Sequence, residues 1–240
     1  DYMSYMFFYP FYYFDPTYVL VLIGVILSLA AQAKVRSTFD KYSRIRSISG
    51  MTGAEAAQRI LHRAGLFDVR IEHVSGHLTD HYDPRKKVLR LSDSVYGSNS
   101  IAAIGVAAHE CGHAIQHQHA YAPLLLRNTL VPIVNFGAAI AWPLILIGLL
   151  LAGSQTLIDL GIILFSTAVL FQLVTLPVEL NASKRAIQKL GESGILYGEE
   201  LNYSRKVLSA AALTYVAAAA TSILQLLRLI ILFGGRRRDS

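Results

Sequence analysis

Four long apolar runs constrain this chain more than any other feature of its sequence. A membrane-spanning helix needs roughly 20 mostly apolar residues, and the runs cover residues 17–33, 130–152, 157–176 and 208–233. The first is barely long enough to cross, and the second contains Pro132 and Pro143, which membrane helices tolerate. With a mean hydropathy of +0.42, the runs predict a mainly α-helical protein with about three to four transmembrane helices.

The positions of Lys and Arg predict the orientation of these helices. Residues 1–33 and 128–176 contain no Lys or Arg, whereas residues 34–127 and 184–206 contain most of them. The positive-inside rule places both basic intervals in the cytoplasm, and three crossings connect them consistently. The net charge of +6 therefore reflects membrane topology, and we expect no nucleic-acid partner.

The last apolar run is ambiguous. Arg228 interrupts it and three further arginines follow at 236–238, so a fourth crossing would place these arginines outside the cell. We therefore favour a last helix that packs on the cytoplasmic part of the chain or lies at the membrane surface. At the other end, residues 1–16 lack the basic segment of a cleaved signal and are rich in aromatic residues. This cluster is expected at the membrane–water interface, with an ordinary aromatic core as the alternative.

The interval 34–129 is expected to form a small cytoplasmic α+β domain. Residues 52–55 form a capping box before a helix that ends near Gly65. Residues 67–74 and 87–92 are typical of strands, and Ser100 can cap a helix that runs to about residue 119. The chain thus divides into residues 1–33 with the first span, 34–129 with the small cytoplasmic domain, 130–176 with a membrane hairpin, and 177–240 with the last helices.

The motif that carries chemistry is HECGH at residues 109–113. Histidines at i and i+4 point from the same face of a helix, so His109 and His113 can bind one zinc ion. Glu110 lies beside the first ligand and is suited to take a proton from the attacking water. The alternative is a helix that carries two solvated histidines.

A catalytic zinc usually has three protein ligands, so a third must come from elsewhere in the chain. The best candidate is Glu179, because it follows the third apolar run on the same predicted side of the membrane as the motif. The hairpin would return the chain to the site. The alternative is that Glu179 pairs with Lys184 or Arg185 at the start of a helix.

The chain resembles the YugP-like family of bacterial membrane zinc metallopeptidases over nearly its whole length. The resemblance rests on LTDHYDP at 78–84, VAAHECGHAIQH at 106–117 and VTLPVELNASKRA at 174–186. The family is similar to HtpX-like and CAAX-prenyl endopeptidases. This implies a gluzincin-like domain with Glu179 as the third ligand. The related enzymes have Asp where this chain has Ser183, so Ser183 or Asn181 could contact a ligand histidine instead.

Weaker candidates surround the motif. His117 could ligate or shape the cleft, although a histidine on the helix surface is the simpler interpretation. Tyr215 or Tyr203 could donate a hydrogen bond to the oxyanion of a tetrahedral intermediate, with core packing as the default. The strand at 87–92 could be an edge that pairs with extended substrate, or an ordinary strand. Residues 80–83 are expected to build a turn, and Cys111 is expected to be a small helix residue.

These features predict a zinc endopeptidase in a bacterial plasma membrane, with several spans and a cytoplasmic catalytic site. Its partners would be the lipid bilayer and a protein or peptide substrate, and the sequence leaves room for a homo-oligomer or a membrane-protein partner. The first alternative is a non-catalytic, metal-stapled adaptor, which a closed four-ligand site would favour. The second is an intramembrane protease, which we disfavour because the apolar part before His109, residues 101–108, is too short to span.

Overall fold

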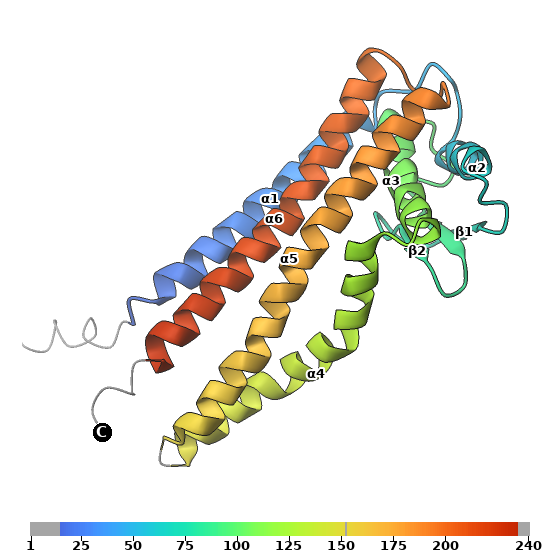
Figure 1. Ribbon diagram of the computed structural model, residues 1–240. Coiled ribbons are helices and arrows are strands. Elements are labelled where there is room, and N and C mark those ends of the chain that lie inside the picture. The colour runs from blue at the N-terminus through green and yellow to red at the C-terminus, as the bar shows by residue number, and fades with distance from the viewer. Residues whose placement is uncertain (1–14, 152, 235–240) are drawn as a thin grey trace, which may run out of the picture.

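The computed structural model describes residues 15–151 and 153–234, and nearly all regular structure in them is helical. Four long helices form a slanted bundle, and a small domain lies at one end of it (Figure 1). The long helices are α1 (Tyr18–Tyr42), α4 (Ala122–Leu150), α5 (Gln155–Glu192) and α6 (Glu199–Phe233). The small domain contains α2 (Gly53–Arg63), α3 (Ile101–Gln118) and the strands β1 (Arg70–Val74), β2 (His81–Asp83) and β3 (Val88–Ser92). The predicted fold class, a mainly α membrane protein with a small sheet domain, is confirmed.

All four long helices are long and apolar enough to cross a membrane. Their outward faces expose large apolar side chains, which water would disfavour and lipid would cover. Well-exposed examples on the four helices are Leu22, Leu29, Phe136, Leu146, Ile163 and Ile231. α4, which contains Pro132 and Pro143, is bent (Figure 1). Pro177 lies inside α5, so the third apolar run and the segment with Glu179 form one continuous helix.

The structure shows where the last helix lies. Near its start, α6 packs on the small domain as expected, through Val207 and Leu208. α6 lies antiparallel to α1 along its length, with Tyr203 stacked on Tyr42 near one end and Thr221 bonded to the carbonyl oxygen of Gly24 farther along. A Cβ atom on Gly24 would lie only 2.9 Å from Thr221 Cγ2, so glycine permits this close approach. α6 therefore reaches the level at which α1 begins, and a membrane crossed by α1 is also crossed by α6.

Arg228 fits a crossing helix because it has partners at the far end of the bundle. Its Nη2 donates to Asp15 Oδ2 at 2.9 Å and its Nε donates to Thr17 Oγ1 at 3.1 Å. Arg228 interrupts the apolar run in the sequence, but in the fold its charge is paired with residues from the other end of the chain. The arginines at 236–238 and the aromatic cluster at residues 1–14 lie outside the described residues.

The small domain has its core between α2, the sheet and α3. The capping box is present, since Thr52 Oγ1 accepts from Glu55 N and Glu55 Oε2 accepts from Thr52 N. Ser100 Oγ caps α3 by accepting from Ala103 N at 3.2 Å. The apolar side of α3 then packs against α2 and β3, and its other side faces α5 and α6.

The sheet decides between the two interpretations of the strand at residues 87–92, which is an ordinary sheet strand. Its strand order is β1-β3-β2, with β1 parallel and β2 antiparallel to β3. β3 is thus the central strand and both of its edges are paired, so it cannot receive a substrate strand. The segment expected to be a turn contains the short strand β2, which pairs His81 with Arg90 and Asp83 with Val88. A strand of three residues is too short to leave a clear alternating pattern in the sequence. The turn expected near residues 80–83 follows at residues 83–86, where Asp83 Oδ1 accepts from Arg85 N and Lys86 N.

Cysteine labelling can test the four-helix arrangement. Tyr197, before α6, and Leu151, at the α4–α5 turn, are exposed at opposite ends of the bundle. Tyr197→Cys and Leu151→Cys should react with a membrane-impermeant maleimide from opposite sides, and Ser240→Cys should react from the Leu151 side. Background should be low, because Cys111 is buried and burial raises the pKa of its thiol. Labelling of Ser240→Cys from the Tyr197 side would contradict a crossing α6.

Candidate metal centre

The site begins with two histidines on one face of α3. His109 and His113 lie one turn apart, with ring centroids 4.8 Å apart and an interplanar angle of 87°. Both side chains are mostly buried, with 13% and 12% exposed. Gly112 lies between them, and a Cβ atom there would lie 2.4 Å from the carbonyl oxygen of Ala182 on α5. The glycine in the motif therefore allows the α5 backbone to lie directly against α3.

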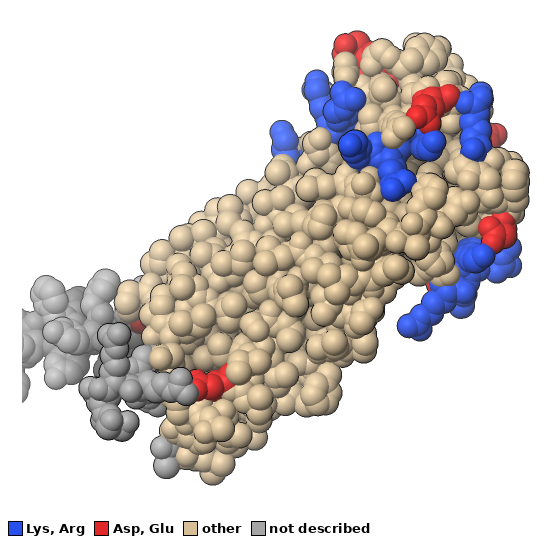
Figure 2. Space-filling view, in the orientation of Figure 1, with Lys and Arg blue, Asp and Glu red and all other residues tan. Residues whose placement is uncertain are grey.

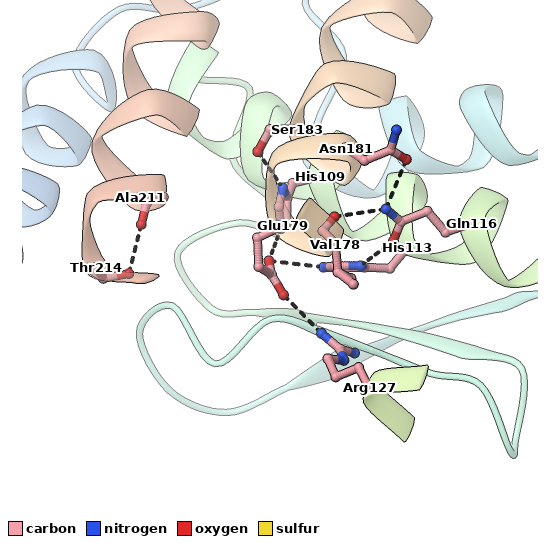
Figure 3. Close-up of polar contacts among 10 residues, drawn as sticks. All are labelled: His109, His113, Gln116, Arg127, Val178, Glu179, Asn181, Ser183, Ala211 and Thr214. Carbon is pink, nitrogen blue, oxygen red and sulfur yellow. Dashed lines mark hydrogen bonds and ion pairs between the residues drawn. The ribbon is translucent and has the colours of Figure 1, made fainter. Parts of the chain in front are cut away.

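This contact brings Glu179 of α5 to the histidines (Figure 3). Glu179 Oε2 lies 3.1 Å from His109 Nε2 and 3.4 Å from His113 Nε2. The possible ligand atoms of the three residues all lie within 4.8 Å of one another. Two imidazole nitrogens and one carboxylate oxygen are donors that zinc binds in catalytic sites. The three predicted ligands thus come together in an arrangement compatible with zinc.

Hydrogen bonds on the outer side fix the orientation of both rings. Ser183 Oγ lies 3.1 Å from His109 Nδ1, and Gln116 Oε1 lies 3.0 Å from His113 Nδ1. Gln116 Nε2 donates to the Val178 carbonyl oxygen, so its Oε1 is the atom left to accept from Nδ1. His113 then carries its proton on Nδ1 and presents Nε2 to the centre. The ring nitrogens nearest Glu179 are the ones available to a metal.

Asn181 acts through Gln116 and does not contact a histidine. Its Oδ1 accepts from Gln116 Nε2 at 3.0 Å and from Arg185 Nε at 2.8 Å. Ser183 and Asn181, the two candidates for contacting a ligand histidine, thus have different roles. Ser183 touches His109 directly, and Asn181 holds the amide that touches His113. Gln116 itself is fully buried and was not foreseen from the sequence, although it lies three residues after His113 on the same helix.

Arg127 is the second residue at the site that sequence reasoning missed. It lies in the first turns of α4, and its Nη1 donates to Glu179 Oε1 at 3.0 Å. The guanidinium therefore holds one carboxylate oxygen and leaves Oε2 toward the histidines (Figure 3). Nothing in the local sequence marks Arg127, because its position depends on the chain reversal between α3 and α4.

The charges of the site support one another. Burial alone would lower the pKa of His113, but its hydrogen bond with Glu179 and the charges of Glu110 and Glu179 raise this pKa above the usual value. A protonated His113 would pair with the Glu179 carboxylate. A metal that binds Nε2 replaces this proton, so metal binding is expected to release protons.

Two small cavities meet at Glu110, which is 9% exposed. One, of about 200 Å³, has both polar and apolar surface, and its lining includes Asp80, Arg127 and Glu179. The other, of about 260 Å³, lies between α1, α3 and α6 and is mainly apolar. Tyr215 of α6 also lines both cavities. Glu110 and Tyr215 therefore face the space in which a substrate could lie beside the metal ligands.

The other weak candidates lie elsewhere. His117 Nδ1 lies 3.0 Å from the Tyr82 hydroxyl, and His117 lies outside the cluster that His109, His113 and Glu179 form among the described residues. Burial and the charges of Asp68 and Asp83 raise the pKa of Tyr82 to about 12, so its hydroxyl stays protonated at neutral pH. Tyr203 stacks on Tyr42 with ring centroids 5.1 Å apart and lines neither cavity. Tyr203 is thus a packing residue.

The fold and this centre define a class: a helical membrane protein with a site for zinc made from two histidines and one glutamate. The chain belongs to the family described as "Putative neutral zinc metallopeptidase", which matches residues 17–234. It is 55% identical over 221 residues to "Putative membrane protease YugP" of Bacillus subtilis (strain 168), covering 92% of this chain and 98% of that protein. The resemblance found in the sequence is thus confirmed. No solved structure matches the chain.

The hydrogen bond that His109 Nδ1 donates to Ser183 Oγ when Nε2 binds a metal should contribute to zinc affinity. Ser183→Ala leaves the ring free to rotate and should weaken zinc binding by about 10- to 100-fold. Ser166→Ala is a matched control, because Ser166 lies on the same helix and bonds only its own turn. Titration with zinc against a competing chelator measures both affinities, and thermal unfolding checks both folds. Equal affinities in the two variants would contradict this role.

Proposed function

We propose that this protein is a zinc-dependent endopeptidase that cleaves protein substrates at the cytoplasmic face of the bacterial plasma membrane. The observation that carries the proposal is the cluster of His109, His113 and Glu179, with donor atoms within 4.8 Å and Glu110 beside them at two cavities. Membership of the metallopeptidase family supports the reaction class. A metal that only stabilises the fold would need neither a buried acid at a cavity nor an open side that a substrate can reach.

The charge distribution supports the cytoplasmic orientation. Lys and Arg gather around the end of the molecule that carries the small domain, and the long helical part is nearly free of them (Figure 2). By the positive-inside rule this end faces the cytoplasm. α3 is not among the four candidate spans, which supports a motif helix beside the membrane over one inside the bilayer.

The roles of the residues follow from their positions. Bound zinc would supply a Lewis acid that polarises the scissile carbonyl and makes a water more acidic. Glu110 would take the proton from the attacking water and deliver it to the leaving amine. His109, His113 and Glu179 would hold the metal, and Ser183, Gln116 and Arg127 would hold these ligands in place. The Tyr215 hydroxyl would donate a hydrogen bond to the developing oxyanion.

Replacement of the general base separates catalysis from metal binding. Glu110→Gln should retain zinc and lower the rate of casein cleavage by about 10²- to 10⁴-fold, because the amide cannot accept the proton. Glu192→Gln, at the exposed end of α5, is the matched control and should cleave like the native protein. Rates are measured on purified, zinc-loaded protein whose metal content is determined in parallel. Unchanged cleavage by Glu110→Gln would falsify the role of Glu110 as general base. Absence of casein cleavage by the zinc-loaded native protein would leave the non-catalytic, metal-stapled adaptor.

The apolar cavity supports a preference for an apolar side chain next to the cleaved bond. It is lined by Val35 and Phe39 of α1 and by Val207, Leu208 and Ala211 of α6, and it reaches Glu110 and His109. Its volume of about 260 Å³ suits a side chain such as Leu or Phe. Such a residue would leave water on binding, which favours it over a polar one.

Ala211→Leu should narrow this cavity. It is expected to lower cleavage beside large apolar residues about tenfold or more and to spare cleavage beside Ala, since overpacking commonly costs 1–3 kcal/mol. Mass spectrometry of the products from a mixed peptide library measures the preference. Ala212→Leu, one residue along α6 and absent from both cavity linings, is the control. Identical product profiles for the two variants would show that another surface selects the substrate.

A further inference from the structure

A groove with a different chemical character from the two cavities at Glu110 lies on the other side of the α1–α6 pair. It has a volume of about 850 Å³ and shares no residue with those two cavities. We call it the basic groove. Its cations are Lys34 and Lys41 from α1 and Arg205 and Lys206 from α6. We propose that the basic groove binds the headgroup of an anionic phospholipid, with the acyl chains along the apolar faces of α1 and α6.

Helical periodicity builds the basic groove from one face of each helix. Lys34, Ser37, Thr38 and Lys41 recur at i, i+3, i+4 and i+7, which lines one side of α1. Asn202, Arg205, Lys206 and Ser209 recur at the same spacing on α6. Hydroxyl and cationic groups from two helices therefore converge on one space, which suits a phosphate with several oxygen acceptors.

The four cations of the basic groove are not neutralised within the protein. None of them forms an ion pair with an acidic residue in the part of the chain that the structure describes. Arg205 Nη1 donates to Asn202 Oδ1 at 3.2 Å, and Lys41 and Lys206 lie over the rings of Tyr42 and Tyr203. The one acidic residue that lines the groove is Glu199, which accepts from Asn202 Nδ2 at 3.3 Å. A net positive charge thus remains for a ligand.

The position of the basic groove along the helices, at the expected boundary of the hydrocarbon core, favours a lipid over a soluble anion. Lys34 is the first basic residue after the apolar run of α1, so the groove begins where the hydrocarbon core would end. From Lys34 to Lys41 a helix rises about 10 Å, comparable to the polar layer of one leaflet. On α6 the lining continues through Ala210 to Leu213, which is 44% exposed, and the apolar surface extends to Val216 and Ile223. Cations at the upper end and apolar surface at the lower end match a phospholipid.

Native mass spectrometry of the full-length protein in zwitterionic detergent can test this site. The probes are phosphatidylglycerol, phosphatidylcholine with the same acyl chains, and glycerol phosphate without acyl chains. The native protein should retain phosphatidylglycerol in preference to phosphatidylcholine. Each interfacial cation contributes about fivefold, so Lys34→Gln with Arg205→Gln should reduce this preference about 25-fold. A 100-fold excess of glycerol phosphate should not displace the lipid.

The matched control removes the same charge at the same level of the membrane. Arg36 and Lys184 are exposed and lie outside the basic groove, so Arg36→Gln with Lys184→Gln should keep the preference. The charge-conserving exchange Lys34→Arg with Arg205→Lys should also keep the preference for phosphatidylglycerol. The single variant Lys206→Gln should reduce this preference about fivefold. Both variants serve as folding references for the double variant. Equal losses in the groove and control variants would mean a general surface effect and overturn the site. Displacement by glycerol phosphate would mean a soluble phosphate site and overturn the lipid. The test needs no peptidase activity, so it is independent of the proposed function.

Discussion

The contact between α3 and α5 at Gly112 is the constraint on which the rest of the site depends. A side chain at this position would meet the carbonyl oxygen of Ala182 at 2.4 Å, so only glycine lets the two backbones lie together. Because Ala182 lies between Glu179 and Ser183, the contact brings one ligand and one supporting hydroxyl to the histidines at once. One residue without a side chain thus sets the distance between ligands that are 70 positions apart in the sequence.

The cost of a buried charge explains the polar groups around this contact. Glu179 has a side chain that is only 6% exposed, and an isolated carboxylate at such a site would strongly destabilise the fold. Arg127 and the two histidines offset this cost. Gln116 Oε1 is the partner of His113 Nδ1, and Asn181 Oδ1 accepts from Gln116 Nε2. The same reasoning applies at the other end of the bundle, where Asp15 and Thr17 accept from Arg228. In both places a charged side chain has partners from a part of the chain that is distant in the sequence.

The sequence was informative wherever the signal is local or repeated. The i, i+4 histidines, the capping box and the apolar runs depend on neighbours in the sequence, so the helices and the three ligand candidates could be predicted. Arg127 could not be placed, because its direction depends on the reversal at residues 119–121. The pairing of Arg228 with Asp15 could not be predicted either, because the two residues are 213 positions apart. The order of the three strands likewise depends on packing against α3, and a run of three residues does not encode it.

The α1–α6 pair connects the candidate site to the membrane through its two faces. Val35 and Phe39 line the apolar cavity beside Glu110, whereas Lys34, Thr38 and Lys41 line the basic groove. α6 is divided in the same way, because Leu208 and Ala211 face the cavity and Ser209 and Ala210 face the groove. The α1–α6 pair thus separates the space for substrate from the surrounding lipid. The cavity and groove linings share no side chain, so one face can change without altering the composition of the other.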